Sequence, residues 1–220
     1  MARAEGWSLL PLAVVCGIAL TACDGGKGAE VARFDRTPKS CAPLTEVTAS
    51  AVTDFAGTLY TASGFSRQNL DELPPTPGAR DYGCNVIFLA ERIPGGSPGE
   101  PETRSVTVSF KLYDTGDRVS RAQDSFRLWR DNTDRRSGVS AAESVSGVGD
   151  EAYSVDDSSS SSAHTEVVFR SSNMIVTVGA RARDFGGAGT PSPELVAKAN
   201  GAAAAIARAV EPELGSIVTG

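Results

Sequence analysis

Several short stretches of this 220-residue chain match patterns that other proteins use for catalysis or ligand binding. Gly95 to Gly99 (GGSPG) has the spacing of a serine nucleophile turn, but Pro98 follows the serine and lacks the backbone N–H that would stabilise an oxyanion. Gly147 to Ala152 (GVGDEA) has the spacing of a dinucleotide-binding turn, but two carboxylates stand where the pyrophosphate would lie. We therefore expect neither acyl transfer nor nucleotide binding at these turns.

Two further matches are equally isolated. Asp184-Phe185-Gly186 spells a kinase tripeptide, but the catalytic residues that accompany it in kinases are missing from the sequence. Asp156 and Asp157 stand beside a run of serines and could bind a hard cation weakly, but the spacing of a calcium-binding loop does not follow. These residues are better explained as a solvated loop, and we expect no catalytic residues, no metal and no cofactor.

His164 is the sole histidine of the sequence and the strongest argument for an enzyme. Its imidazole could serve as general base to one of the many serines, since acyl transfer by a triad needs one imidazole. A lone histidine beside Ser158 to Ser162 at the start of a strand is more often an exposed surface residue. A pair of carboxylates could also hydrolyse a glycoside, although nothing singles out one pair. A hydrolase that uses His164 or carboxylates is therefore the enzymatic alternative.

Two segments are candidates for ligand binding. In GVGDEAY, Gly147 and Gly149 permit positive φ and a close backbone approach just before Asp150 and Tyr153. A tight turn, with Asp150 bonded to local backbone N–H groups and Tyr153 packed into a sheet, explains the same residues. The second segment is a long loop over 61–83, with three aromatic residues near its ends that either grip a ligand or close the core: Tyr60, Phe65 and Tyr82.

The elements that must position these residues follow from the hydrophobic pattern. Apolar residues at helical spacing predict helices over 45–60 and 117–132, and Ser192 with Pro193 predicts the start of a third that ends before Pro212. Strands are predicted over 82–92, 106–112, 151–156, 164–170 and 174–181. We therefore expect a single α+β domain over 41–211, with an antiparallel sheet of about five strands covered by two or three helices, and a tail over 212–220.

The first residues predict export. Leu9 to Leu20 is a twelve-residue apolar stretch, which is the length of a signal sequence core and too short to span a bilayer. The stretch closes on Leu20-Thr21-Ala22-Cys23, which resembles the bacterial lipobox. The resemblance implies a signal peptide over 1–22, a lipid on Cys23 and a flexible tether over 23–40. An ordinary secretory signal and an uncleaved anchor are the alternatives.

Two cysteines then remain for the folded domain. Because Cys16 leaves with the signal and Cys23 takes the lipid, Cys41 and Cys84 are left, and in an exported domain the simplest explanation is a disulfide. Two free thiols or a metal site are the alternatives, and a zinc site would lack ligands. The net charge of −6, from 21 basic and 27 acidic residues, gives no basic surface for phosphates, so we expect no nucleic-acid partner.

Taken together, several features resemble small exported lipoproteins of actinomycetes, a family catalogued mainly as a domain of unknown function. They are the lipobox, Cys41, Cys84 within YGCNVIF, GVGDEAY, RSSNMIVTV and an alanine-rich closing helix, and they span most of 41–211. The resemblance implies an α+β domain similar to PsbP-like folds on the outer face of the cytoplasmic membrane, with no family catalytic residues.

We therefore expect a lipid-anchored, non-enzymatic binding or accessory protein of the cell envelope. Its partner would be a small molecule, an envelope glycan or an envelope protein, and the membrane itself through the N-terminal lipid. An envelope hydrolase and a passive structural component are the alternatives.

Overall fold

The computed structural model describes residues 30–70, 76–91, 99–157, 161–186 and 189–220. The expected signal peptide, the lipobox with Cys23 and residues 95–98 of the serine turn lie outside the described residues. Within the described ranges, no helix has the length and the apolar character needed to cross a membrane.

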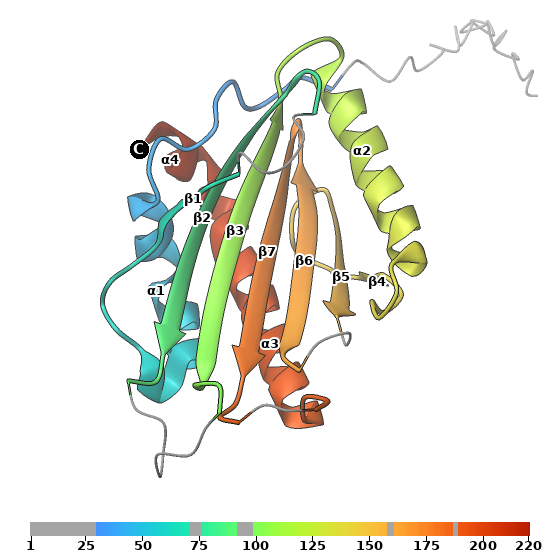
Figure 1. Ribbon diagram of the computed structural model, residues 1–220. Helices are drawn as coiled ribbons and strands as arrows, with labels where there is room; N and C mark the ends of the chain where they lie inside the picture. The colour runs from blue at the N-terminus through green and yellow to red at the C-terminus, as the bar shows by residue number, and fades with distance from the viewer. Residues whose placement is uncertain (1–29, 71–75, 92–98, 158–160, 187–188) are drawn as a thin grey trace, which may run out of the picture.

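The described strands form one antiparallel sheet in the order β1-β2-β3-β7-β6-β5-β4 (Figure 1). Their bounds are Ser66–Gln68 (β1), Ala79–Leu89 (β2), Thr103–Tyr113 (β3), Glu143–Ser144 (β4), Glu151–Asp157 (β5), Ala163–Ser171 (β6) and Met174–Arg183 (β7). The prediction of about five strands is therefore wrong, because the sheet has seven, although the domain is still α+β. The two missed strands, β1 and β4, are three and two residues long, too short to show an alternating pattern.

The first face of the sheet is covered by α1 (Ala42–Ala56) and α3 (Pro193–Val210). The main core lies here, between these helices and every second residue of the central strands, such as Val108 and Val178. Alanines on the buried side of α3 let this helix lie close to the sheet. The predicted start of α3 is confirmed, because the Ser192 hydroxyl accepts a hydrogen bond from the Leu195 N–H at 3.2 Å.

Both ends of α1 differ from the prediction of 45–60. The helix begins at Ala42, directly after the disulfide-bonded Cys41, with a proline in its first turn. It ends at Ala56, because Gly57 adopts a positive φ of 57° and the chain continues as the short 3₁₀ helix η1 (Gly57–Leu59).

Residues 212–220, expected to form a tail, instead complete the core. The chain passes through η4 (Glu211–Glu213) into the short helix α4 (Leu214–Thr219). Leu214, Ile217 and Val218 are buried against the same core as α1 and α3. The expected domain boundary at 211 is therefore wrong. The proline at position 212 ends the α3 pattern in the sequence, but it sits at the start of a new turn that the helical chain continues through.

The second face of the sheet is covered only in part, by α2 (Arg118–Asn132) and the following η3 (Thr133–Arg135). The Asp117 side chain caps α2 by accepting a hydrogen bond from the Ser120 N–H. Fully buried Ala122 and Phe126 pack on a second, smaller core. Figure 1 shows α2 toward the β6 and β5 side of the sheet, and α2 also contacts β3 and β7, so it leaves part of this face without a helix.

Candidate functional site

The uncovered part of the second face holds a cavity of about 390 Å³ whose lining residues come from four strands. We call it the open sheet face, and its residues are Gln68 of β1, Ser105, Thr107 and Ser109 of β3, His164 and Glu166 of β6, and Thr177, Gly179 and Arg181 of β7. Strand pairing explains the set, because Thr107 and Glu166 are both register partners of Gly179. Side chains at every second position of β3 and β7 therefore converge on this face.

Glycines keep the floors of this cavity and of the adjoining cavity at β1 recessed. A Cβ atom added at Gly179 would lie 3.4 Å from Nε2 of His164, and one at Gly83 of β2, which lines the adjoining cavity, would lie 2.9 Å from Oε1 of Gln68. Neither glycine has a positive φ, so their backbone conformations do not require glycine. What their missing side chains provide is space below the surrounding polar groups.

His164 lies in the wall of the cavity between two carboxylates. Its Nδ1 atom is 3.9 Å from Oδ2 of Asp157, and its Nε2 atom is 3.8 Å from Oε1 of Glu166. Burial lowers the pKa of the imidazole; the carboxylates of Glu166 and Asp157 oppose this shift, and the Arg181 guanidinium adds to it. The side chain is only 15% exposed, so the expectation of an exposed histidine is wrong. The run of serines before His164 predicted an exposed loop, but β6 pairs with β5 and β7 on its two sides, and these strands enclose the histidine.

The open sheet face adjoins a more apolar cavity of about 380 Å³, with which it shares Ser109 and Thr177. Leu70, Trp129 and Ile175 line this part, so α2 contributes its indole as a wall. A further cavity of about 270 Å³ is also lined by Trp129, together with Glu166 and Thr177. The cavities therefore form one continuous surface along the edge of α2.

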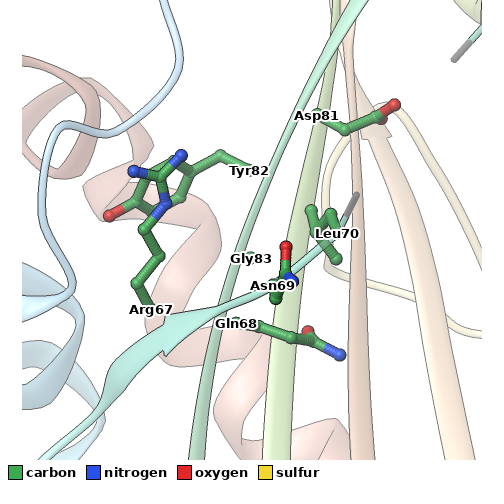
Figure 2. A pocket seen from close by; sticks show the side chains of 7 residues that line it. All are labelled: Arg67, Gln68, Asn69, Leu70, Asp81, Tyr82 and Gly83. Carbon is green, nitrogen blue, oxygen red and sulfur yellow. The ribbon is translucent and has the colours of Figure 1, made fainter. Parts of the chain in front are cut away.

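Figure 2 shows the edge of the sheet at β1, where a cavity of about 360 Å³ adjoins the open sheet face. Arg67 and Tyr82 lie together on one side of the strand, with the guanidinium 5.4 Å from the centre of the phenol ring. Gln68 points the opposite way and lines both this cavity and the open sheet face. Its Oε1 atom is buried and, like Nδ1 of His164, has no hydrogen-bond partner among the described residues.

The GVGDEAY segment is a structural turn before β5. At Gly149 φ is +59°, and an added Cβ atom would lie 2.4 Å from the backbone oxygen of Arg170, so only glycine fits. The Asp150 carboxylate accepts a hydrogen bond from the Ser172 N–H at 2.6 Å and pairs with the Arg170 guanidinium at 2.9 Å. Asp150 therefore fastens this turn to the turn between β6 and β7, rather than to its own neighbours. Gly147 also has a positive φ, and nothing lies within 4 Å of a Cβ atom added there.

Tyr153, the last candidate of that segment, belongs to the core under α2. Its ring packs edge-on to Phe126 with ring centres 5.3 Å apart, and burial raises its pKa to about 12. It also lines the 270 Å³ cavity beside Trp129. Of the four residues predicted in this segment, Tyr153 is the one that reaches the site.

Tyr60 and Phe65 lie at the opposite side of the sheet, against α1. They border a space of only about 20 Å³, which is room for about one water molecule. The Tyr60 ring stacks near Phe88 with centres 5.8 Å apart, and the Phe65 N–H donates to the Thr45 hydroxyl at 3.0 Å. These two aromatic residues therefore close the edge of the core and are not brought together with the open sheet face.

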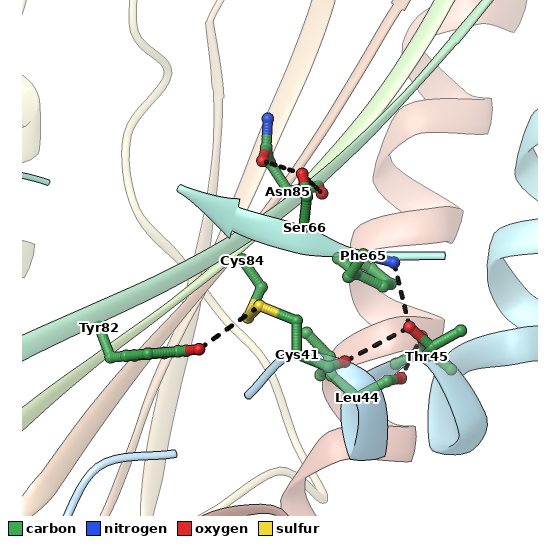
Figure 3. The surroundings of a disulfide bond; sticks show 9 residues. Cys41, Leu44, Thr45, Phe65, Ser66, Tyr82, Cys84 and Asn85 are labelled. Atoms are coloured by element: carbon green, nitrogen blue, oxygen red, sulfur yellow. Dashed lines mark hydrogen bonds between the residues drawn. A yellow bond between two sulfur atoms is a disulfide. The ribbon is translucent and has the colours of Figure 1, made fainter. Parts of the chain in front are cut away.

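The disulfide between Cys41 and Cys84 is confirmed, with a Cα to Cα distance of 5.8 Å (Figure 3). It ties the start of α1 to the middle of β2. The hydroxyl of the third predicted aromatic residue, Tyr82, lies 3.8 Å from Sγ of Cys41 on the same side of the sheet. Tyr82 therefore packs beside the disulfide and also lines the β1 edge cavity.

The metal-binding alternative has no counterpart in the described residues, which contain no group of three or more His, Cys, Asp or Glu side chains placed to hold an ion. Asp156, one of the two aspartates considered for a cation, accepts a hydrogen bond from the Thr165 hydroxyl. Asp157 instead faces His164.

Comparisons with known proteins add little. No family model and no curated protein matches the chain. The crystal structure of LpqN, a protein involved in cell envelope biogenesis of Mycobacterium tuberculosis, is similar at 14% sequence identity and a TM-score of 0.30. The likeness covers 66% of this chain and 81% of the LpqN chain. A likeness of this degree assigns no function to the chain.

Proposed function

We propose that this protein is a lipid-anchored, extracytoplasmic binding protein of the cell envelope, without catalytic activity of its own, and that the open sheet face holds its ligand. One observation carries the binding role: polar side chains from four strands converge on a recess of about 390 Å³. Cavities that bind small molecules are typically of this size and contain a few convergent polar groups.

The glycines favour binding over a passive structural role. Gly83 and Gly179 lie inside long strands, where glycine costs about 0.5–1 kcal/mol relative to alanine. A sheet face that served only as a surface would gain stability from larger side chains at these positions. Small residues in a strand interior are typical of places where another molecule approaches the backbone closely.

The proposed location at the membrane is based on the sequence. The short apolar stretch before Cys23 and its resemblance to a lipobox support cleavage and lipidation, and an intact disulfide suits an oxidising compartment. Cys23→Ala should abolish incorporation of labelled palmitate and release the protein from membranes. Cys16→Ala is the matched control, because that thiol leaves with the signal peptide. Membrane retention of the Cys23→Ala protein would contradict the anchor.

The ligand-binding role is tested by native mass spectrometry of the full chain, purified in detergent from the envelope of its own host. We expect a co-purifying mass that Gly179→Leu removes, because the new side chain fills the recess against His164. Gly201→Leu is the control, since Gly201 of α3 is exposed and nothing lies within 4 Å of an added Cβ atom. A bare wild-type protein, or a mass retained by Gly179→Leu, would argue against this binding site.

The hydrolase alternative uses either carboxylates or His164, and its imidazole version depends on His164, which lies in the same cavity. Under this version, the wild-type protein cleaves a glycoside or an ester, and His164→Ala abolishes that cleavage. Under the proposed function, wild type and His164→Ala are equally inactive toward glycosides and esters, while ligand retention differs between them.

A further inference from the structure

We infer that the ligand of the open sheet face is a neutral carbohydrate, an inference that rests on the proposed binding function. Three properties of the recess point to this chemical class: a ladder of hydroxyl groups, a balance of charge, and an indole wall.

The hydroxyl ladder comes from adjacent strands. Ser105, Thr107 and Ser109 occupy alternate positions of β3, about 7 Å apart along the strand, and Thr177 is the register partner of Ser109 on β7. A hydroxyl group both donates and accepts hydrogen bonds, and it can rotate to suit its partner. A row of such groups matches a ligand whose own surface mixes donors and acceptors, which is the property of a polyhydroxylated ring.

The charge of the recess is balanced. Among its nine lining residues, Glu166 carries one negative charge and Arg181 one positive charge, and burial disfavours the charged form of His164. A site for phosphate or another polyanion would instead concentrate cationic groups. A site for a quaternary ammonium group would surround it with aromatic rings, and the recess has none in its floor. The lining therefore favours a ligand without net charge.

One buried polar atom in the lining of the recess lacks a partner. Oε1 of Gln68 has no hydrogen-bond partner among the described residues. Buried polar groups are normally paired, so this atom has an interaction to gain from a bound molecule. Gln68 stands on β1 and His164 on β6, so a ligand that fills the recess between them must extend across β2, β3 and β7. This span requires more than a single small group and suits a ring or a short chain of rings.

The indole of Trp129 supplies the apolar wall. It is half-buried and lines two cavities that share Thr177. An aromatic ring presents a flat apolar surface at little cost in conformational entropy. A sugar ring has an apolar face of C–H groups between its hydroxyls, so the indole and the hydroxyl ladder together match the two kinds of surface on one ligand.

Trp129 also makes the test direct, because the sequence contains only one other tryptophan, Trp7. In the Trp7→Phe protein held in detergent, tryptophan fluorescence reports on the site alone, whether or not the expected signal peptide that contains position 7 has been removed. The probe is the neutral oligosaccharide fraction released by mild acid from the host envelope, of known monosaccharide composition. We expect a saturable change in fluorescence.

Isosteric variants assign the binding to the ladder. Thr107→Val and Thr177→Val each remove one hydroxyl group and should weaken binding about threefold to tenfold. Thr58→Val, at an exposed position of η1, is the matched control and should leave the affinity unchanged. Equal affinity of all three variants would overturn the role of the ladder. Mixing the protein with the intact, insoluble envelope polysaccharide distinguishes the two sources of the sugar. If the protein sediments with the polysaccharide, the ligand is an envelope glycan. If the protein binds only the soluble oligosaccharides, the ligand is a free saccharide.

Native mass spectrometry of the host-purified protein distinguishes failure of this inference from failure of the proposed function. In one outcome, the protein co-purifies with a mass that contains no sugar and that Gly179→Leu removes. If this protein also gives no response to the oligosaccharide fraction, the carbohydrate inference is overturned and the binding site stays in place. A bare protein that also fails to respond would overturn both.

Discussion

The side chain of Asn173 holds the backbone of Phe34 with two hydrogen bonds, although 139 residues separate them in sequence. The Phe34 N–H donates to Oδ1 at 3.0 Å, and Nδ2 donates to the Phe34 carbonyl at 2.8 Å. Nδ2 also donates to the Tyr113 carbonyl at 2.9 Å. One fully buried amide therefore joins the N-terminal segment, the end of β3 and the turn between β6 and β7.

Asn173→Ala should lower the free energy of unfolding by about 2–4 kcal/mol, because it leaves buried backbone groups of Phe34 and Tyr113 unpaired. It should also release residues near 30–35 to proteolysis before the domain unfolds. Asn200→Ala, on partly exposed α3, is the control. Urea denaturation and limited proteolysis measure the two effects, and equal stability of the two variants would contradict the role assigned to this amide.

Gly149→Ala should be much more damaging than Gly147→Ala. Both residues have positive φ, which costs a non-glycine residue about 1–2 kcal/mol. At Gly149 the new methyl group would also meet the Arg170 carbonyl, whereas at Gly147 nothing lies within 4 Å. We expect losses of about 3 kcal/mol or more and about 1 kcal/mol, respectively, by chemical denaturation. Similar losses for both variants would show that the turn can move away from β6.

The His164 pKa should lie below its ordinary value of 6.5, because burial disfavours the imidazolium ion. Since the unfolded chain then takes up a proton first, stability should fall as the pH drops through 6.5 and should level off below the folded pKa. Glu166→Gln should lower this pKa further, and Arg181→Gln should raise it. As the sequence has one histidine, a single imidazole signal in an NMR titration measures all three values. A wild-type pKa at or above 6.5 would contradict the buried position.

Tyr153 should ionise near pH 12, because burial under α2 disfavours the phenolate. Its folded pKa lies above the value of about 10 in the unfolded chain, so its contribution to stability is complete below pH 10 and is lost as the pH rises toward 12. Tyr153→Phe should remove one late step from an ultraviolet pH titration. If the late step remains in Tyr153→Phe, it belongs to another tyrosine.

The Cys41–Cys84 bridge should make the mature protein lighter, by the mass of two hydrogen atoms, before reduction than after it. Closing a loop with a sequence separation of 43 residues should stabilise the fold by about 4 kcal/mol in the chain-entropy model. The double variant Cys41→Ala, Cys84→Ala should lose about that amount in thermal or urea unfolding. Two thiols that react with an alkylating agent without reduction would rule out the bridge.

Much of the fold is predictable because its signals are local. The cap at Ser192, the helical spacing before Trp129 and the alternation of Val106 and Val108 each lie within a few neighbouring residues. The missed parts depend on distant partners: β1 and β4 become strands only by pairing with β2 and β5. The helix α4 was missed because its three buried residues follow a proline that usually marks an end.

The open sheet face was missed for a similar reason. The polar residues of β3 alternate with its core residues, and this pattern predicts only that they face away from the core. That Thr107 would meet Gly179, and that α2 would leave this end of the sheet uncovered, depends on a strand order that the sequence does not reveal. The sequence does single out His164 as the sole histidine. Its neighbour Glu166 lies on the same strand, but Arg181 is brought beside it by the pairing of β6 with β7.

The short outer strands have a consequence for association between copies of the chain. β1 and β4 are the edge strands of the described sheet and are only three and two residues long, and β1 pairs only with residues 83–85 of the longer β2. Long exposed edges allow neighbouring copies to join strand to strand into fibres. The short β1 and β4 therefore limit the backbone pairing that another copy of this chain could make with these two strands.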